Sequence, residues 1–569
     1  MLFRSWVSAL GRSEFSLATL LDEIATKLGR EDLRKLAPDA KAAQVASLVS
    51  GSPTLVVLDN FETVSEEEQA RCLDFFAQAV CPALVTTRYF INCDDVNNVP
   101  LAAMMMEEAR DFLHRLIERT RKPSNFDRLD RDDLIRRCEA NPLVLQWVVR
   151  QIDLAKRPQD VLDDLAHGEG DAAERVFTRS FNLPQLGDDG RTALLALSLF
   201  TPHASREALA EVSGFDDDMR RLNKMVESLS SLWLVEATER NERLFLRGLT
   251  RELAKSQLSK DIHADSLRRS YVTYFLRYAE AHVQVTPDDF DALETEKDNL
   301  LGAMDVASAA SEWQSVMQIS DALNEFLFLR GYWDEAIKSA EQGKAAAHET
   351  NDEWNIAAFG GNVALILSSR GEYEETKRIY LEGLEIFRKL EGGQRNVAAS
   401  LSQLGIIVQK RGELKEARKF YGESLEVSKG IEDHVGIARA LHQLGKVAYL
   451  QDELQEARRL FGESLKTARK VGAHHIIAYS LHSLATITLE GPKGRRQLFE
   501  ESLDISNKLG DQYLIAHTMR SLGLIEEEEG NATEAARLFS EALRIFERLN
   551  APEVEMTRNE LLRVEGGAV

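Results

Sequence analysis

The amino-acid sequence predicts a multidomain, mostly α-helical protein that begins with a partial, parallel-sheet α/β domain and ends in an α-solenoid. Three observations carry this expectation. Short apolar strand patterns alternate with helical patterns near the beginning, helices followed by a hairpin pattern occupy the middle, and a pattern with a period of about 40 residues fills the rest. The length of 569 residues allows three or four domains of roughly 150 residues each.

Composition and charge narrow the class of protein. Hydrophobic residues make up 44 % and charged residues 29 % of the chain, which is ordinary for packed globular domains. The formal net charge of −23 repels phosphate backbones, so nucleic acid is an unfavoured partner. The four cysteines form no CxxC pair, which predicts free thiols. Arg4 and Arg12 interrupt the apolar run that a signal peptide would need, and no apolar run is long enough to span a membrane. We therefore expect a cytoplasmic protein with no membrane contact.

The α/β expectation rests on residues 1–168. Residues 2–10, 54–59 and 83–88 read as strands, and helical patterns at 15–28 and 65–80 separate them. Such a βαβ order implies parallel strands, whose carboxyl ends share the edge where ligands bind. Asp59 ends the second of these strands, where a carboxylate can hold Mg²⁺ against phosphates. An aspartate that caps the following helix explains the same position equally well.

Residues 169–311 are predicted to be largely helical. Helical patterns are followed by a two-stranded hairpin pattern at 232–249, and helices that end in a hairpin suggest a winged helix over 169–260. Residues 261–311 predict a helical linker.

The repeats extend over residues 312–550, with a tail at 551–569. Similar heptapeptides recur at 330–336, 370–376, 411–417, 451–457 and 529–535, and the unit around 491–503 is two residues short. Each unit resembles a tetratricopeptide repeat, because Gly405, Ala417 and Tyr421 fall where that family has small, small and aromatic residues. We expect about six helix pairs, in which the small residues let two antiparallel helices approach.

A second resemblance covers nearly the whole chain. The order of TLVVLDNFE, ALVTTR and CEANPLVLQWV resembles the nucleotide-binding core of NB-ARC ATPases, the STAND branch of P-loop NTPases. The segments RLFLRGLTRELA and LETEKDNLLGAM resemble the end of the family's winged helix and the segment that leads into the repeat arrays of bacterial members. The resemblance implies an ADP/ATP cofactor with Mg²⁺ and nucleotide-dependent oligomers.

The same resemblance assigns site residues. Asp59 matches the Walker B acid that holds Mg²⁺ through the nucleotide, Arg88 the sensor arginine and Pro142 the proline near the adenine. Arg247 occupies the place of a histidine that contacts ADP. The full set of nucleotide-contacting positions is Asp59, Asn60, Thr86, Thr87, Arg88, Pro142 and Arg247.

Three departures from the family pattern weaken the predicted activity. No G-x-x-x-x-G-K-[ST] loop occurs, so the phosphate cradle would have to lie upstream of residue 2, in a longer protein of which this is a cut version, or be lost in a degenerate member. Asn60 replaces an acid and leaves Glu62 as the candidate catalytic base, so the protein is at most a slow ATPase. Arg247 stays charged where the family has histidine.

The first helices of the repeats predict a peptide-binding groove. Positions that line the concave face of tetratricopeptide arrays hold Arg439, His442, Lys446, Tyr449, Tyr479, His482, His517 and Arg520. Basic side chains interleaved with tyrosines suit an acidic peptide from a partner or from the chain's own nucleotide module. Ordinary solvated helix faces are the alternative interpretation.

The leading functional hypothesis is a STAND-type signal-transduction regulator, in which an ADP/ATP switch is coupled to a protein-binding repeat array. The alternative is an interaction scaffold with a non-binding nucleotide fold. A winged-helix transcription factor is a third hypothesis, for which Arg220, Arg221 and Lys224 supply positive charge, but three acids precede them.

Overall fold

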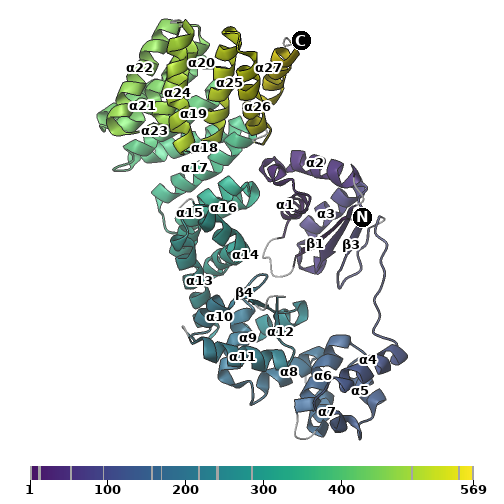
Figure 1. Ribbon diagram of the computed structural model, residues 1–569. Helices are drawn as coiled ribbons and strands as arrows, with labels where there is room; N and C mark the ends of the chain where they lie inside the picture. The colour runs from purple at the N-terminus through teal and green to yellow at the C-terminus, as the bar shows by residue number, and fades with distance from the viewer. Residues whose placement is uncertain are drawn as a thin grey trace. The chain divides into compact units, whose positions relative to one another are not determined.

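The computed structural model is mostly helical, with a small parallel sheet near the beginning of the chain and solenoid repeats toward its end (Figure 1). It describes residues 3–9, 15–51, 54–93, 95–154, 158–167, 170–215, 218–238, 242–283, 286–488, 491–509, 511–548 and 551–566. These residues fall into two compact units, Met1–Ala346 and Ala347–Val569. Within the described part of the chain, no helix combines the length and the hydropathy needed to cross a bilayer.

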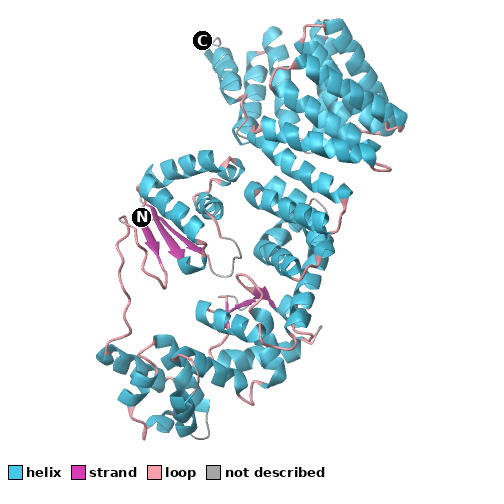
Figure 2. Cartoon of the chain, turned by 180° about the vertical axis from the view of Figure 1, so that it is seen from behind, coloured by secondary structure: helices cyan, strands magenta, loops and turns pink. Residues whose placement is uncertain are grey.

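The first unit begins with a three-stranded parallel sheet, drawn in magenta in Figure 2. Its order is β1 (Phe3–Ser8), β2 (Thr54–Asp59) and β3 (Ala83–Val85). The register sets Ser8 opposite Asp59 and Leu58 opposite Val85. The connections contain α1 (Leu17–Lys27), α2 (Pro38–Gly51) and α3 (Glu66–Ala79), as the βαβ pattern predicts.

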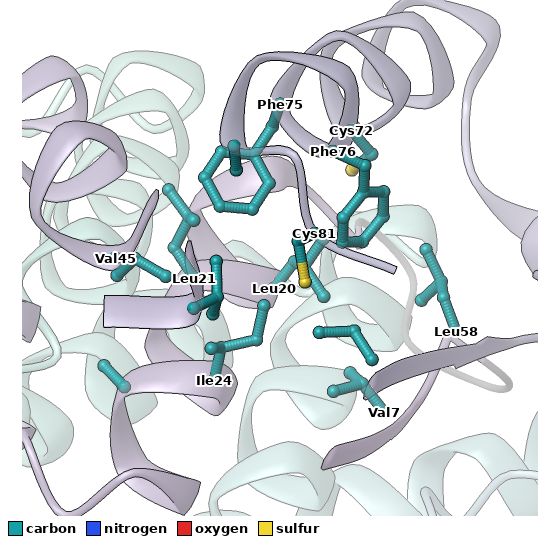
Figure 3. Close-up of a cluster of buried hydrophobic side chains, with 14 of the residues drawn as sticks. Val7, Leu20, Leu21, Ile24, Val45, Leu58, Cys72, Phe75, Phe76 and Cys81 are labelled. Atoms are coloured by element: carbon teal, nitrogen blue, oxygen red, sulfur yellow. The ribbon is translucent and has the colours of Figure 1, made fainter. Parts of the chain in front are cut away.

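One hydrophobic core joins the sheet to these three helices (Figure 3). Its side chains include Val7 and Leu58 from the strands, Leu20, Leu21 and Ile24 from α1, Val45 from α2, and Phe75 and Phe76 from α3. Cys72 and Cys81 are buried in the same cluster, and all four cysteines are free thiols, as predicted. Because burial raises the pKa of Cys72 to about 12, its thiol stays protonated and unreactive.

The rest of the first unit is helical apart from a second small sheet. Its helices up to that sheet are α4 (Met106–Glu118), α5 (Arg131–Arg137), α6 (Pro142–Leu154), α7 (Pro158–His167), α8 (Ala172–Asn182) and α9 (Gly187–Leu197). They are followed by β4 (Ala204–Ser205), α10 (Arg206–Val212), α11 (Met219–Ser231), β5 (Glu236–Ala237), β6 (Arg243–Phe245) and α12 (Gly248–Leu258).

The second sheet contains the hairpin that the sequence predicts. Strands β5 and β6 pair antiparallel, and residues 239–241 of the intervening turn lie outside the described residues. β4 adds to β6 and gives the order β4-β6-β5. No sequence pattern indicates β4, because two residues are too few to show alternation.

Helix pairs follow along the chain. The first unit closes with α13 (Ala264–Ala281), α14 (Pro287–Ala309), α15 (Trp313–Arg330) and α16 (Trp333–Glu349). The second unit holds α17 (Glu353–Arg370), α18 (Tyr373–Lys389), α19 (Gln394–Lys410), α20 (Leu414–Gly430), α21 (His434–Leu450), α22 (Leu454–Val471), α23 (His474–Ile487), α24 (Gly491–Leu509), α25 (Gln512–Glu528), α26 (Ala532–Arg548) and α27 (Val554–Gly566).

Small residues bring the two helices of a pair together, as their spacing predicts. A methyl group on Gly405 would lie 2.5 Å from the Tyr421 ring, and one on Gly445 would lie 2.7 Å from the Phe461 ring. These distances are far below van der Waals contact, so only glycine permits this packing. The shortened unit is accommodated in its first helix, since α23 has 14 residues where α21 has 17.

The last helix, α27, lies in the segment expected to be a tail. It packs against α26, and Val564 joins Phe539 in a shared hydrophobic cluster. The repeat pattern did not predict this helix, because it follows the last recurrence of the repeated heptapeptide at 529–535.

Candidate functional site

The predicted nucleotide residues meet in part at the carboxyl end of β2. Thr86 donates a hydrogen bond from its hydroxyl to Asp59 Oδ1 at 2.5 Å, and the Asn60 side-chain amide donates to Asp59 Oδ2 at 2.9 Å. The Asn60 backbone N–H donates to the Thr86 hydroxyl at 3.0 Å. Asn60 adopts a left-handed backbone with φ of 59°, which asparagine tolerates better than most residues. Both carboxylate oxygens of Asp59 therefore accept hydrogen bonds from the protein.

Arg88 lies between two carboxylates. Its Nε is 3.2 Å from Glu62 Oε1, and its Nη1 is 2.7 Å from Glu252 Oε2 on α12. The ion pair with Glu252 joins the loop after β3 to α12, which follows the hairpin. Thr87 accepts a hydrogen bond from the Tyr89 N–H, which holds the same loop.

Two predicted residues lie in other local environments. Pro142 is the first residue of α6, which packs against α4, α7 and α8. Arg247 is the N-cap residue of α12, is about half exposed, and forms an ion pair with Glu236 of β5. Within the described residues, neither takes part in the hydrogen bonds and ion pairs around Asp59 and Arg88.

As paired here, these groups do not fit a magnesium-bound nucleotide. Asp59, Glu62 and Glu252 supply three carboxylates against the single guanidinium of Arg88. A phosphate needs compensating positive charge, and Arg88 is already paired with Glu62 and Glu252. ADP/ATP with Mg²⁺ remains a prediction of the resemblance, as do the roles of Glu62, Pro142 and Arg247.

A buried ion cluster that the sequence analysis missed lies in the same unit. Lys41 of α2 is fully buried, and its Nζ is 2.7 Å from Asp22 Oδ1 on α1 and 2.5 Å from Asp334 Oδ2 on α16. Burial raises the pKa of Asp22 to about 7, against the opposing charge of Lys41. Nearby, the Arg34 guanidinium lies 4.3 Å from the centre of the Tyr332 ring.

This cluster, Asp22, Lys41 and Asp334, joins the α/β domain to α16, and we call it the Lys41 latch. A lysine and an aspartate in amphipathic helices give no sequence signal of a contact between segments so far apart.

Along the concave helices of the second unit, two predicted histidines are drawn into the protein, His442 buried and His482 half-buried. His442 is 8 % exposed and its Nδ1 lies 3.3 Å from the Ser480 hydroxyl, while His482 Nδ1 lies 3.1 Å from the Thr518 hydroxyl. Burial lowers the pKa of His442 to about 3 and that of His482 to about 4. Both rings are therefore neutral at physiological pH.

Further along, the predicted basic residues are neutralised by the following helices. Arg520 donates two hydrogen bonds to Glu560, at 2.7 and 2.5 Å, and His517 Nε2 lies 3.2 Å from Glu553. This differs from the expectation of free positive charge, because the acids lie in the segment expected to be a tail. Similarly, the Tyr479 ring packs on His475, which pairs with Asp511.

The side chains of α21 behave differently. Arg439 and Lys446 are exposed, and Tyr449 is 44 % exposed. Within the ranges given above, neither Arg439 nor Lys446 has an acidic partner. The surrounding protein and the charge of Lys410 lower the pKa of Lys446. Of the predicted groove residues, these three remain available to a ligand.

Comparisons with known proteins identify the repeats. The tetratricopeptide repeat family matches residues 356–430 and 437–476. A search of the curated proteins finds no match.

Solved structures with similar folds include a STAND protein with a tetratricopeptide repeat sensor from Pyrococcus horikoshii, with 16 % identity, coverage of 98 % of this chain and 91 % of that chain, and a TM-score of 0.38. Another is aspartyl phosphate phosphatase F from Bacillus subtilis, with 10 % identity, coverage of 83 % and 95 %, and a TM-score of 0.35. BtubC from P. vanneervenii has 18 % identity, coverage of 38 % and 92 %, and a TM-score of 0.34. This chain contains tetratricopeptide repeats.

Proposed function

We propose that this protein is an interaction scaffold in signal transduction, whose sensing element is the tetratricopeptide array and whose nucleotide fold does not bind nucleotide. The observation that carries the proposal is the array itself, in which consecutive helix pairs match the tetratricopeptide repeat family and α21 presents Arg439, Lys446 and Tyr449 as exposed side chains. Such a surface is suited to an extended peptide from a protein partner. The basic side chains of α21 favour an acidic segment.

The contacts of the α/β domain support a regulatory rather than a catalytic role for it. The Lys41 latch holds α1 and α2 against α16, and the Arg88–Glu252 pair holds the loop after β3 against α12. Elements that pack by charge pairs can open when a partner favours another packing. In this proposal the α/β domain responds to how α12 and α16 pack against it, because Lys41 and Arg88 form ion pairs with those two helices.

A STAND-type regulator, in which an ADP/ATP switch is coupled to the repeat array, is the second candidate function. It is favoured by one observation, that Asp59, Thr86 and Arg88 gather at the carboxyl end of the sheet, in the order that the NB-ARC resemblance requires. The charge balance around Arg88 weighs against it, as does the hydrogen bonding of Asp59. A nucleotide-dependent oligomer belongs to this candidate alone.

Nucleic-acid binding through the proposed winged helix is the least supported function. Arg221 pairs with Asp189 at 2.5 Å and lies over the Phe215 ring, so its charge is engaged within the protein. The remaining basic residues of α11 are too few to overcome a chain charge of −23.

A direct titration separates the first two candidates. Fluorescent ADP with Mg²⁺ is titrated into the full chain, and the lead proposal predicts no saturable binding at micromolar concentrations. Saturable binding that Asp59→Ala abolishes, and that the exposed control Asp74→Ala retains, would instead establish the nucleotide switch.

A further inference from the structure

One stripe of α21 differs from the other charged surfaces of the array. Arg439, Lys446, Tyr449 and Leu450 are separated by seven, three and one positions, which places them along one side of a helix. Leu450 is 53 % exposed and Tyr449 is 44 % exposed. Buried His442 lies between Arg439 and Lys446 on this side and is neutral. The stripe thus combines two cations with two apolar surfaces and carries no acid.

A third cation belongs to the same surface. Lys410, the last residue of α19, is exposed and lies near enough to Lys446 for its charge to lower the pKa of that residue. Its Nζ lies 5.7 Å from the centre of the Tyr373 ring, and it has no carboxylate partner among the residues described. We call Lys410, Arg439 and Lys446 the α21 basic cluster.

Several exposed arginines of the array, by contrast, are neutralised by built-in acids. Arg378, Arg459 and Arg537 each lie between a glutamate three residues before and another four residues after, and each contacts both. The concave residue Arg520 has Glu560. Two like charges held close without a counterion cost free energy that a bound anion would recover.

This inference rests on the proposed role of the array. We propose that the α21 basic cluster binds a carboxylate side chain of an acidic partner segment, and that Tyr449 and Leu450 contact an apolar side chain beside it. The carboxylate accepts charge-assisted hydrogen bonds from Arg439 and Lys446. The other predicted groove residues, His517 and Arg520, are occupied by Glu553 and Glu560 and contribute no anion contact.

A peptide fits this surface better than a nucleic acid. The cluster offers three cations over two helices, whereas a polyanion needs a longer basic track.

The test measures binding of labelled peptides to the full chain by fluorescence anisotropy. The probe is a peptide of alternating glutamate and leucine, about twelve residues long so that it spans several helices, with a glutamine–leucine peptide of equal length for comparison. The double variant Arg439→Glu/Lys446→Glu reverses two of the three charges of the cluster. Lys470→Glu, an exposed lysine at the end of α22, is the matched control for the change of charge.

We expect the acidic probe to bind at least tenfold more tightly than the glutamine probe, and the double variant to lose at least tenfold in affinity while Lys470→Glu changes it less than twofold. Wild-type affinity retained by the double variant, with a thermal unfolding midpoint that shows it is folded, would overturn carboxylate binding by the cluster. If Tyr479→Ala then abolishes binding, the array still binds peptides and the proposed function stands. Failure of both peptides to bind would contradict carboxylate binding by the cluster and the sensing role together. Displacement of the probe by an equal concentration of oligouridylate of the same length would assign the cluster to nucleic acid instead.

Discussion

The Lys41 ammonium nitrogen lies 2.5 Å from the Asp334 carboxylate, although 293 positions separate the two residues in sequence. Lys41 is fully buried and also contacts Asp22, which is nearly as buried. Removing a buried cation that contacts two anions strongly destabilises the protein, because the two negative charges are left uncompensated. The packing of α2 against α16 therefore depends on the charges of Asp22, Lys41 and Asp334.

Lys41→Met is predicted to loosen this packing. The expected local destabilisation is about 3 kcal/mol, the order that loss of one partner in a buried pair produces. Native-state hydrogen exchange should accelerate in α1, α2 and α16. The exposed residue Lys27, at the end of α1, gives the control Lys27→Met. Adding Asp22→Asn to Lys41→Met should restore part of the protection, and a double variant that exchanges as fast as the single would contradict the electrostatic explanation.

Gly445→Ala is predicted to destabilise the second unit. The added methyl group would meet the Phe461 ring at 2.7 Å, and overpacking of this kind costs about 1–3 kcal/mol. Gly462, inside α22, has nothing within 4 Å of such a methyl group, so Gly462→Ala should stabilise by about 0.5–1 kcal/mol through helix propensity. Urea unfolding followed by circular dichroism measures both, and equal midpoints for the two variants would refute this account of pair packing.

Glu560→Gln is predicted to weaken the attachment of α27. The substitution removes the charge that faces the two donors of Arg520, in a pair whose side chains are only 17 % and 10 % exposed. The cost should be about 1–3 kcal/mol, visible as faster hydrogen exchange in α27. Glu565→Gln, at an exposed position of the same helix, should leave the exchange rates unchanged. Equal effects of the two variants would show that the Arg520 pair does not hold the helix.

The array should lose stability as the medium is acidified. The folded-state pKa values of His442 and His482, about 3 and about 4, lie below the value of 6.5 for an unperturbed histidine. The unfolded chain therefore takes up protons first as the pH falls. The loss in free energy of unfolding begins as the pH falls below about 6.5, reaches roughly 2 kcal/mol for each histidine at about pH 5, and levels off below the folded-state pKa values of about 4 and about 3.

Urea midpoints at about pH 7.5 and about pH 5 measure this dependence. His442→Gln should reduce the difference between the two midpoints, because one titrating group is removed. His434→Gln, at the exposed beginning of α21, should leave the difference as in the wild type. A pH dependence that is identical in all three proteins would exclude His442 as its source.

The elements with strong local signals were predictable from sequence. The period of the repeats identified the helix pairs, and the glycines at Gly405 and Gly445 marked the close approaches. Asp59 was correctly expected at the end of a parallel strand, because alternating apolar strands and helices fix that position.

Contacts between distant segments were not predictable. Nothing in the sequence around Lys41 or Glu252 indicates which partner each side chain meets, and the charges of Arg88 and Arg520 appeared available until their carboxylate partners were located. Burial also reversed the expected role of His442, because a histidine on a predicted concave face is indistinguishable in sequence from one enclosed beneath it.

The affinity of the glutamate–leucine probe, measured on the full chain with and without saturating Mg²⁺ and ADP, tests the central claim most directly. The charges near Arg88 are paired within the protein, so we expect Mg²⁺ and ADP to leave peptide binding by the array unaffected. The dissociation constant should then be the same in both conditions, within twofold. A change of about tenfold, which corresponds to a coupling free energy of about 1.4 kcal/mol, would contradict that account and show that the protein is a nucleotide switch.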